Sequence, residues 1–291
     1  MPVIAVTGAT GFIGRHLCQH FRGLGWEVRA LARNPGEYPF DVPGIRLHRC
    51  DLPDVIDRAA LEGASAVVHC AYMTRFTNRA AAERVNELGT RRVIGIARAA
   101  RVDRLVFLSS QSAHTGAESY YGLSKLALES LFDGEVVLRA GLVIGRAGSG
   151  LFHRMCATVR TARVVPLFDG GRQPIQTVHV SDLCHAVEQC LAKGLTGLYS
   201  VAEPGWQPMR QFLQEIARRM SRRPLFVPVP MAPALLALRA IERAGLAFPV
   251  SSENLLGLKC LRATDTARDL AMLGLKVRSA GDSLDEALGE R

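Results

Sequence analysis

The stretch Met1–Gly14, MPVIAVTGATGFIG, decides the fold that the sequence predicts. Its apolar run Val3–Val6 is rich in β-branched residues and is long enough for one buried strand, but too short for a helix. The segment TGATGFIG (7–14) then breaks the strand, and residues 15–21 continue with helical character. The chain is therefore predicted to turn sharply from a strand into a helix at these glycines.

The three glycines of this turn are spaced as a phosphate-binding loop requires. Gly8 permits the tight turn, Gly11 lets backbone N–H groups approach a phosphate, and Gly14 lets the helix pack closely on the sheet. The helix start, with Phe12 and Ile13, directs free N–H groups and partial positive charge at that phosphate. A purely structural glycine-rich turn is the alternative. The position on the first strand, before an apolar helix, favours dinucleotide binding.

Short apolar runs recur after this turn and alternate with predicted helices. The runs lie at residues 28–32, 45–48, 66–69, 105–108 and 136–139, and helices are predicted over 79–101 and 120–132. Six strands that alternate with helices predict an α/β fold with a doubly wound parallel sheet. In such a sheet ligands bind beyond the carboxyl ends of the strands, at the point where the strand order reverses.

The second half of the chain is less regular. Helices are predicted over 151–161, 209–220 and 234–244, and Ser181 and Asp182 are expected to cap a further helix that ends at 193. Strands are predicted over 175–180 and 198–201. The proline-rich segment 225–233 is predicted to be a linker or a sheet edge. We expect a dinucleotide-binding domain over 1–165 and a smaller, interdigitated substrate-binding region over 166–291. Residues 175–201 are expected to return to the sheet, and the apolar stretch 231–248 is expected near the substrate mouth.

The amino-acid composition favours some classes of protein and argues against others. The 291 residues are 48% hydrophobic and 22% charged, which is ordinary for a globular enzyme, and no apolar run is long enough to predict a membrane span. The net charge of +9 comes from arginines spread along the chain, which favours attraction of nucleotides over a nucleic-acid partner. Seven scattered cysteines without zinc spacing predict reduced thiols and no metal site. Without a basic leader and cleavage site, we expect a cytoplasmic protein without a membrane partner.

Residues after the predicted strands are candidates for holding the cofactor. Arg33 follows the second strand, where no acidic residue stands, and an arginine there pairs with a 2′-phosphate, which favours NADP(H) over NAD. A solvated loop arginine is the alternative. Asp51, followed by Leu52, either accepts a hydrogen bond from the adenine amino group or caps a helix that begins near Pro53. Ala71 follows the fourth strand and is expected beneath the cofactor.

Tyr121 and Lys125 are four residues apart at the start of a predicted helix and therefore share one of its faces. An ammonium group close to a phenol lowers the pKa of the tyrosine, which makes Tyr121 a candidate acid/base for hydroxyl–carbonyl interconversion. Ser110, at the end of the neighbouring strand, could bind the same substrate oxygen. A packed tyrosine beside a surface lysine is the alternative, and the upstream dinucleotide loop favours the catalytic interpretation.

An ordered set of motifs resembles the extended short-chain dehydrogenase/reductase family, of the NAD-dependent epimerase/dehydratase type. The motifs are TGATGFIG (7–14), DL (51–52), HCAY (69–72), VNELGT (85–90), FLSS (107–110), YGLSK (121–125), LRAGLVIG (138–145), VHVSDL (178–183), LYSVAEP (198–204) and the tail LGLKVRSAGDSLDEAL (273–288). The resemblance implies a Rossmann domain with NAD(P) and a Ser–Tyr–Lys site. It also implies that Asn86 positions water near Lys125, that Lys125 bonds the nicotinamide ribose, and that the chain forms a homodimer.

The sequence departs from the family pattern between Ser110 and Tyr121. Counting back from Gly116 places the catalytic serine position on Gln111, whereas aligning the serine pair gives Ser110, with Ser112 as the alternative. The stretch is shorter than in most epimerases, a feature shared with reductase-like relatives and with non-catalytic accessory proteins. We therefore expect an NAD(P)-dependent oxidoreductase or epimerase acting on a secondary alcohol or carbonyl, with a nucleotide sugar as the favoured substrate. An NADPH-dependent reductase of a small apolar carbonyl compound and a non-catalytic NADP(H)-binding regulatory or assembly protein are the alternatives.

Overall fold

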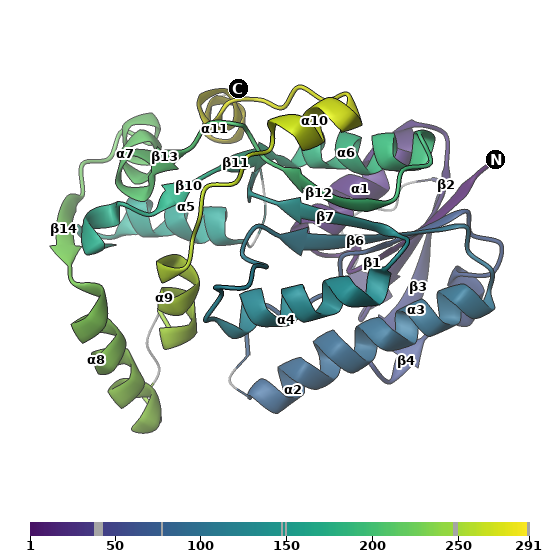
Figure 1. The fold of residues 1–291 in the computed structure, drawn as a ribbon, viewed down its shortest axis with the longest axis horizontal. Helices are drawn as coiled ribbons and strands as arrows, with labels where there is room; N and C mark the ends of the chain where they lie inside the picture. The colour runs from purple at the N-terminus through teal and green to yellow at the C-terminus, as the bar shows by residue number, and fades with distance from the viewer. Residues whose placement is uncertain (38–42, 77, 147, 149, 247–249, 290–291) are drawn as a thin grey trace.

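An eight-stranded sheet with the order β12-β7-β6-β5-β1-β2-β3-β4 forms the centre of the protein (Figure 1). The computed structural model describes residues 1–37, 43–76, 78–146, 148, 150–246 and 250–289. The strands of this sheet are β1 (Val3–Thr7), β2 (Glu27–Ala32), β3 (Ile45–Asp51), β4 (Val55–Ile56), β5 (Ala66–His69), β6 (Arg104–Ser110), β7 (Val136–Ala140) and β12 (Gly197–Val201). All pairings in it are parallel except that of β3 with β4. The predicted doubly wound α/β fold is confirmed.

Helices cover both faces of the sheet. They are α1 (Phe12–Gly23), α2 (Arg79–Glu83), α3 (Gly89–Ala99), α4 (Tyr120–Glu129), α5 (Leu151–Thr161), α6 (Val180–Ala192), α7 (Met209–Arg219), α8 (Met231–Arg243), α9 (Ser252–Lys259), α10 (Ala267–Leu273) and α11 (Ala280–Leu288). Figure 1 shows α1, α6 and α10 on one face, with α3 and α4 on the other. A π-helical segment, Arg84–Leu88, joins α2 to α3. Among the described residues, no helix combines the length and apolarity that a membrane crossing requires.

Strand β1 shows how the sequence produces the two layers. Successive side chains of a strand point to opposite faces. Accordingly, Ile4 and Val6 pack with α1 and α6 in one apolar core, and Ala5 lies in the core beneath α3 and α4. All three side chains are fully buried, which is why this strand has no polar alternation in its sequence.

The strand order reverses beside β1. The chain runs from β1 outward through β2 and β3, then crosses back to add β5 on the opposite side of β1. The carboxyl ends of β1 and β5 therefore flank a crevice in which the connections diverge, which is the place where doubly wound sheets bind ligands.

Two local predictions are wrong. The helix expected near Pro53 is not formed, because the chain turns back there and β4 pairs with the end of β3. The helical turn that follows is the short Arg58–Ala60, and its cap is Asp57, whose carboxylate accepts from the N–H of Ala59 at 3.1 Å. Asp51 therefore caps no helix, and the run 53–56 is too short to form one.

The second correction concerns the segment before α6. His179, not Ser181 or Asp182, caps α6 by accepting from the N–H of Ser181 at 3.3 Å. Asp182 instead holds the chain before α11, because its Oδ2 accepts from the N–H of Arg278 at 2.9 Å. Residues 175–180 do not form one strand of the large sheet, although β12 does lie at the edge of that sheet.

Smaller pairings and helices build the C-terminal part. Its strands are β8 (Leu142–Ile144) paired with β11 (Thr177–His179), β9 (Val164–Phe168) with β14 (Leu225–Val229), and β10 (Pro174–Ile175) with β13 (Gln207–Pro208). The predicted proline-rich edge 225–233 thus contains β14 and the start of α8. Helices α5, α7 and α11 enclose a third apolar core, and α8 and α9 enclose a fourth.

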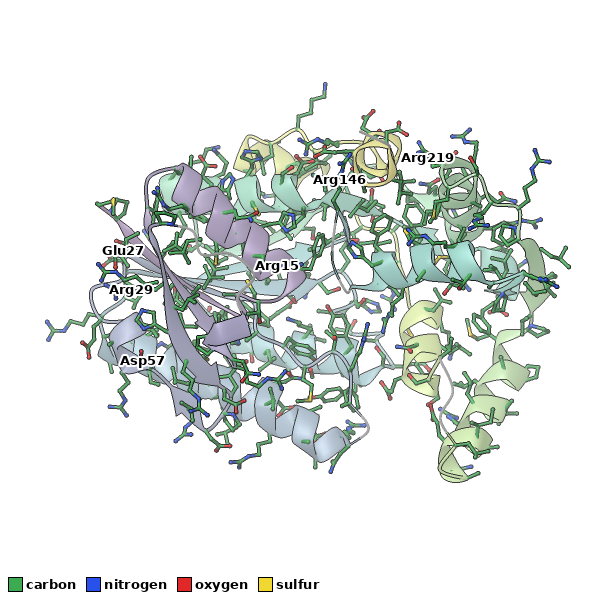
Figure 2. All side chains as sticks on the ribbon, turned by 180° about the vertical axis from the view of Figure 1, so that it is seen from behind. Arg15, Glu27, Arg29, Asp57, Arg146 and Arg219 are labelled. Carbon is green, nitrogen blue, oxygen red and sulfur yellow. The ribbon has the colours of Figure 1, made fainter. Side chains whose placement is uncertain are left out.

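Hydrogen bonds and an ion pair from two arginines hold helix α11 against the rest of the protein. Figure 2 labels Arg146 and Arg219, which lie beside α11. Arg146 donates to the carbonyl of Glu286 at 2.7 Å, and Arg219 pairs with Asp285 at 2.7 Å. The C-terminal segment is thereby held against the same body as the sheet.

Candidate active site

The glycine loop closes directly on the end of β5. Gly8 has a φ of +66°, a left-handed conformation that favours glycine, and a Cβ at this position would lie 2.9 Å from Ala71 Cα. A Cβ on Gly14 would lie 2.3 Å from the carbonyl oxygen of Gly8, so α1 and the loop approach each other more closely than any side chain permits. The structure thus brings the predicted loop and Ala71 together at the reversal point of the sheet.

The start of α1 fits a dinucleotide phosphate. Its N-cap is Gly11, which offers no side-chain hydrogen bond, and the first turn carries no acidic side chain. The N–H groups of that turn are therefore not occupied by a capping side chain, and a negative charge is favoured at this end of the helix. The residues present fit the pyrophosphate of NAD(P), which would be held by Gly11, Phe12 and Ile13.

The other predicted cofactor residues lie along the same edge of the sheet. Arg33 is exposed just beyond β2, and the loop is joined to that strand because Ala9 N–H donates to the carbonyl of Leu31 at 3.1 Å. Asp51 ends β3, and Leu52 packs against the backbone of α3, where a Cβ on Gly89 would lie 2.9 Å from it.

The start of α4 is held in three ways, and this placement positions Tyr121. Ser119 caps the helix by accepting from Gly122 N–H at 3.3 Å, and Glu253 of α9 accepts from Tyr120 N–H at 2.7 Å. Gly122 also lets the helix settle on the end of β6, because a Cβ there would lie 2.5 Å from the carbonyl oxygen of Ser112.

The phenol of Tyr121 lies close enough to the hydroxyl of Ser110 for the serine to influence it. Burial raises the pKa of Tyr121, and the Ser110 hydroxyl acts in the opposite direction without cancelling the effect of burial. Ser112 contributes its backbone N–H, which donates to Ser110 Oγ at 3.2 Å. Of the candidate serines, Ser110 is therefore the one whose hydroxyl lies at the tyrosine.

The ammonium of Lys125 is held by a backbone carbonyl and two aromatic rings. Its ammonium donates to the carbonyl of Leu108 at 2.6 Å and lies 4.3 Å from the ring centre of Tyr72 and 4.5 Å from that of Phe107. Burial lowers the pKa of Lys125 to about 7. The expectation that Lys125 lowers the pKa of Tyr121 is not met in this structure, because the ammonium is directed at the Leu108 carbonyl and these two rings.

Tyr72 is a site residue that the sequence analysis did not single out. Its hydroxyl is hydrogen-bonded to Ser124, its ring face receives the ammonium of Lys125, and its ring lies edge-to-face with Tyr121 at 5.4 Å. The signal was present in the sequence as the last residue of HCAY, immediately after the end of β5. Tyr72 thus contacts both Lys125 and Tyr121.

Asn86 is buried in the π-helical segment, not on the surface as is usual for a lone helical asparagine. Its Oδ1 accepts from Met73 N–H at 2.7 Å, and its Nδ2 donates to the Met73 carbonyl at 3.2 Å. The same nitrogen lies 3.4 Å from the hydroxyl of Tyr120. Asn86 therefore fixes the loop after β5 against α4.

A buried chain of hydrogen bonds connects Asn86 to β1. His69 Nδ1 lies 2.8 Å from Thr7 Oγ1, and its Nε2 lies 2.9 Å from Thr90 Oγ1. Because Thr90 donates to the carbonyl of Asn86, it accepts from Nε2–H, and Nδ1 accepts from the hydroxyl of Thr7. Burial lowers the pKa of His69 to about 3, with the charge of Lys125 acting in the same direction, so the ring is neutral.

Arg75 and Arg154 lie close enough for their charges to interact. Arg75 lines a pocket of about 460 Å³ together with Met73, Phe76, Asn78 and Ala81. Burial and the charge of Arg75 lower the pKa of Arg154 on α5. The preceding residue, His153, packs its ring at 5.0 Å from that of Phe12 in the glycine loop. Helix α5, which carries Arg154, therefore contacts the glycine loop through His153.

The fold and the loop define a dinucleotide-binding protein of the Rossmann class. The chain belongs to the NAD dependent epimerase/dehydratase family, whose model matches residues 4–202. The predicted family, and with it an NAD(P)-dependent enzyme of the epimerase, dehydratase or reductase type, is confirmed.

Curated relatives include two reductases. A ceramide reductase of Caulobacter vibrioides is 29% identical over 256 residues, which cover 83% of this chain and 78% of the relative. A dTDP-4-keto-6-deoxy-D-glucose reductase of Streptomyces niveus is 29% identical over 227 residues, covering 69% and 74%. Among solved structures, UDP-glucuronic acid 4-epimerase of Bacillus cereus, in complex with UDP-glucuronic acid and NAD, has a TM-score of 0.76 at 17% identity, covering 98% of each chain. At this identity the structural likeness is one of fold.

Proposed function

We propose that the chain interconverts a secondary alcohol and a ketone on a nucleotide sugar, using NADP(H) and Tyr121 as the acid/base. The observation that carries this proposal is the proximity of the Tyr121 phenol to the Ser110 hydroxyl at the carboxyl edge of the sheet, with Lys125 one helical turn along α4. When bound, the nicotinamide supplies or accepts the hydride.

The side chains of the protein transfer the proton and position the substrate. In the reducing direction, the Tyr121 hydroxyl gives its proton to the ketone oxygen as the carbonyl carbon gains the hydride. Ser110 donates a hydrogen bond to the same oxygen and stabilises the negative charge that develops there. Asn86 keeps the loop after β5 in place, and Lys125, whose ammonium has three N–H donors, would bind the ribose next to the nicotinamide with a donor that the Leu108 carbonyl does not use.

Arg33 supports a preference for NADP(H). It is exposed beyond the end of β2, where the ribose 2′-position of the adenosine is expected, and a guanidinium pairs with a phosphate through two parallel hydrogen bonds. Asp51, at the end of β3, would accept from the adenine amino group.

Arg75 and Arg154 support an anionic substrate. Two guanidinium groups close enough for one to lower the pKa of the other repel each other, and a bound diphosphate relieves that repulsion. We expect the diphosphate of a nucleotide sugar to reach Arg154, because the preceding residue, His153, packs against Phe12 of the glycine loop.

The test is a turnover assay with a panel of nucleotide sugars and NADPH, comparing the wild type with Tyr121→Phe. Loss of the acid/base should lower kcat by about 10²- to 10⁴-fold and leave NADPH affinity unchanged. Tyr199→Phe is the matched control, because this tyrosine lies on the edge strand β12 and its hydroxyl donates to the carbonyl of Thr196, just before that strand. Unchanged turnover in the Tyr121 variant would remove this residue from the mechanism.

A reductase of an apolar ketone is the second candidate. The relatives described above include reductases, one of them named for ceramide, an apolar lipid. Leu225, Leu236 and Leu246 are each more than 60% exposed on the C-terminal part, on or next to β14 and α8. The end of the apolar stretch 231–248 that was expected near the substrate mouth lies outside the described residues.

Two measurements separate the candidates. A ketone reductase releases one NADP⁺ for each product, whereas an epimerase is redox-neutral overall. Arg154→Ala should raise KM for a nucleotide sugar by about tenfold or more, because a charge-assisted hydrogen bond is lost, and should leave KM for a neutral ketone unchanged. Equal effects on both substrates would count against the anion-binding role of this arginine.

A further inference from the structure

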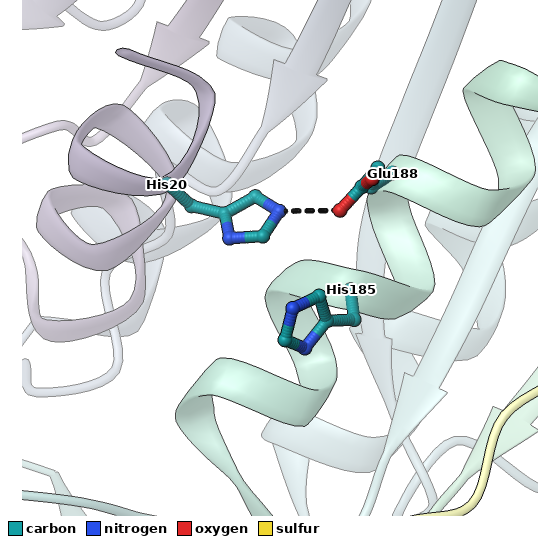
Figure 3. Close-up of side chains that lie close together, drawn as sticks. All are labelled: His20, His185 and Glu188. Carbon is teal, nitrogen blue, oxygen red and sulfur yellow. Dashed lines mark hydrogen bonds and ion pairs between the residues drawn. The ribbon is translucent and has the colours of Figure 1, made fainter. Parts of the chain in front are cut away.

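A cluster of metal-ligating side chains lies on the outer side of the molecule, between α1 and α6. Figure 3 shows His20 on α1 facing His185 and Glu188 on α6. One ligand atom from each residue lies within 4.8 Å of the other two. His20 Nε2 is 2.8 Å from Glu188 Oε2, and the two imidazole rings are perpendicular with centres 4.9 Å apart. The cluster was not predicted, because its members come from segments 168 residues apart.

The two helices hold the cluster on a rigid base. His185 and Glu188 are three residues apart on α6 and therefore lie on one face. Beneath them, Leu17 and Phe21 of α1 share a fully buried core with Leu183 and Val187 of α6. Packing of this kind fixes the distance between the helix backbones and leaves only the side chains free to adjust.

The donor set has the chemistry of a transition-metal site. Two imidazoles and one carboxylate suit Zn²⁺ and its neighbours Co²⁺ and Ni²⁺, whereas Mg²⁺ and Ca²⁺ prefer oxygen ligands throughout. Tetrahedral coordination with metal–ligand bonds of about 2.0–2.1 Å separates ligand atoms by about 3.3 Å. Side-chain rotation of the exposed His185 can supply the approach that this requires.

The surroundings favour a cation as well. His20 lies in the last turn of α1, where the helix dipole places partial negative charge. Its side chain is 16% exposed and that of Glu188 is 28% exposed, so the cluster is partly shielded yet open to solvent on the side of His185.

We propose that His20, His185 and Glu188 bind one divalent transition-metal ion of the Zn²⁺ class, with water in the fourth position. The metal replaces the hydrogen bond between His20 and Glu188 by bonds to both groups and joins α1 to α6. It lies about 12 Å along α1 from Phe12, because eight residues of helix separate them, so it acts as a clamp on the helix that starts at the glycine loop and not as a catalytic ion.

The test uses the full-length, tag-free protein, stripped with a chelator and titrated with ZnCl₂ by calorimetry. Wild type should bind one Zn²⁺, and His185→Ala should weaken binding by about tenfold or more, because one of three protein ligands is lost. Glu188→Gln should weaken it as well. Gln189→Ala is the matched control, since it changes the neighbouring residue of α6 and removes no ligand; its affinity should equal that of the wild type.

Two further readouts do not depend on activity. CoCl₂ should give the intense visible absorption of tetrahedral Co²⁺ in wild type and Gln189→Ala, and not in His185→Ala. Zn²⁺ should raise the Tm of the same two proteins, because it binds the folded state. The proposal is overturned if wild type binds no Zn²⁺, or if His185→Ala and Glu188→Gln bind it as tightly as wild type does.

Discussion

The side-chain amide of Asn86 pairs with the backbone of Met73 through both of its polar atoms, accepting from the N–H at 2.7 Å and donating to the carbonyl at 3.2 Å. The side chain of Asn86 thus makes the two backbone hydrogen bonds that a neighbouring strand would make, because the chain leaves the sheet after β5. Because the loop continues into Tyr72 on one side and Arg75 on the other, the pair fixes two residues of the candidate site at once.

Replacing Asn86 by Ala should loosen this loop. The substitution leaves two backbone groups of Met73 without partners, which costs about 1–3 kcal/mol for each group that stays buried. We expect faster amide hydrogen exchange at Met73 and a lower kcat. Asn254→Ala is the control, because it removes a capping asparagine of α9 and touches neither Met73 nor Tyr120. Unchanged exchange at Met73 in Asn86→Ala would contradict the positioning role.

His69 should make the protein sensitive to acid. Its pKa is about 3 in the folded chain and 6.5 when unperturbed, so between these pH values the unfolded chain binds the additional proton. The contribution of the neutral ring to stability is fully present above pH 6.5 and is lost as the pH falls toward 3, with a slope of up to about 1.4 kcal/mol per pH unit.

Urea unfolding of wild type and His69→Gln, from about pH 7 to about pH 5, measures this contribution. The variant cannot titrate at this position, so the difference in unfolding free energy between the two proteins should shrink as the pH falls. Parallel curves for the two proteins would show that the ring does not titrate in this way.

Gly14→Ala should abolish dinucleotide binding and destabilise the fold. The added Cβ would lie 2.3 Å from the Gly8 carbonyl oxygen, so α1 must move away from the loop. On the same helix, a Cβ at Gly23 meets nothing within 4 Å, and Gly23→Ala should preserve binding and keep or raise stability by up to about 1 kcal/mol. Thermal unfolding and NADPH fluorescence measure the two effects. If Gly14→Ala binds NADPH as the wild type does, then the close approach of α1 to the glycine loop is not required for dinucleotide binding.

Arg33→Ser should weaken NADPH binding by about 10- to 100-fold, because hydrogen bonds to a charged group contribute about 1.5–3 kcal/mol, and should leave NADH binding unchanged. Arg46→Ser is the control: this arginine is 69% exposed near the amino end of β3, away from the carboxyl edge of the sheet. The dissociation constants of NADPH and NADH for each variant show whether Arg33 determines the preference between the two dinucleotides. A variant with the wild-type preference would leave Arg33 as a solvated loop arginine.

Local signals predicted most of the elements. The strand over 66–69 and the helix over 151–161 have the predicted boundaries, because each combines an uninterrupted pattern with clear breaks on both sides. The helix predicted near Pro53 was wrong because Asp51, two residues before the proline, was taken as a possible helix cap, whereas the chain there pairs β4 with β3. His179 was overlooked as the cap of α6 because its side chain is not a usual capping group.

The site was predictable only in part. The glycine loop and the Tyr121–Lys125 spacing depend on neighbours in the sequence, and both occur at the predicted edge. The position of the Lys125 ammonium could not be predicted from neighbours in the sequence, because it depends on a carbonyl of β6 and on the ring of Tyr72. The proximity of Arg75 to Arg154 likewise depends on a loop and a helix that begins 76 residues later.

The amino-acid sequence is enough to predict the order of strands and helices and the chemistry of the glycine loop, because these follow from the hydrophobic period and from the residues that permit a tight turn. That His69 is neutral, that Asn86 holds Met73 and that His20 faces Glu188 are known from the folded chain alone. The physical reason is that burial and hydrogen bonding arise between segments that the strand crossovers bring together, and no local pattern records which side chains then meet.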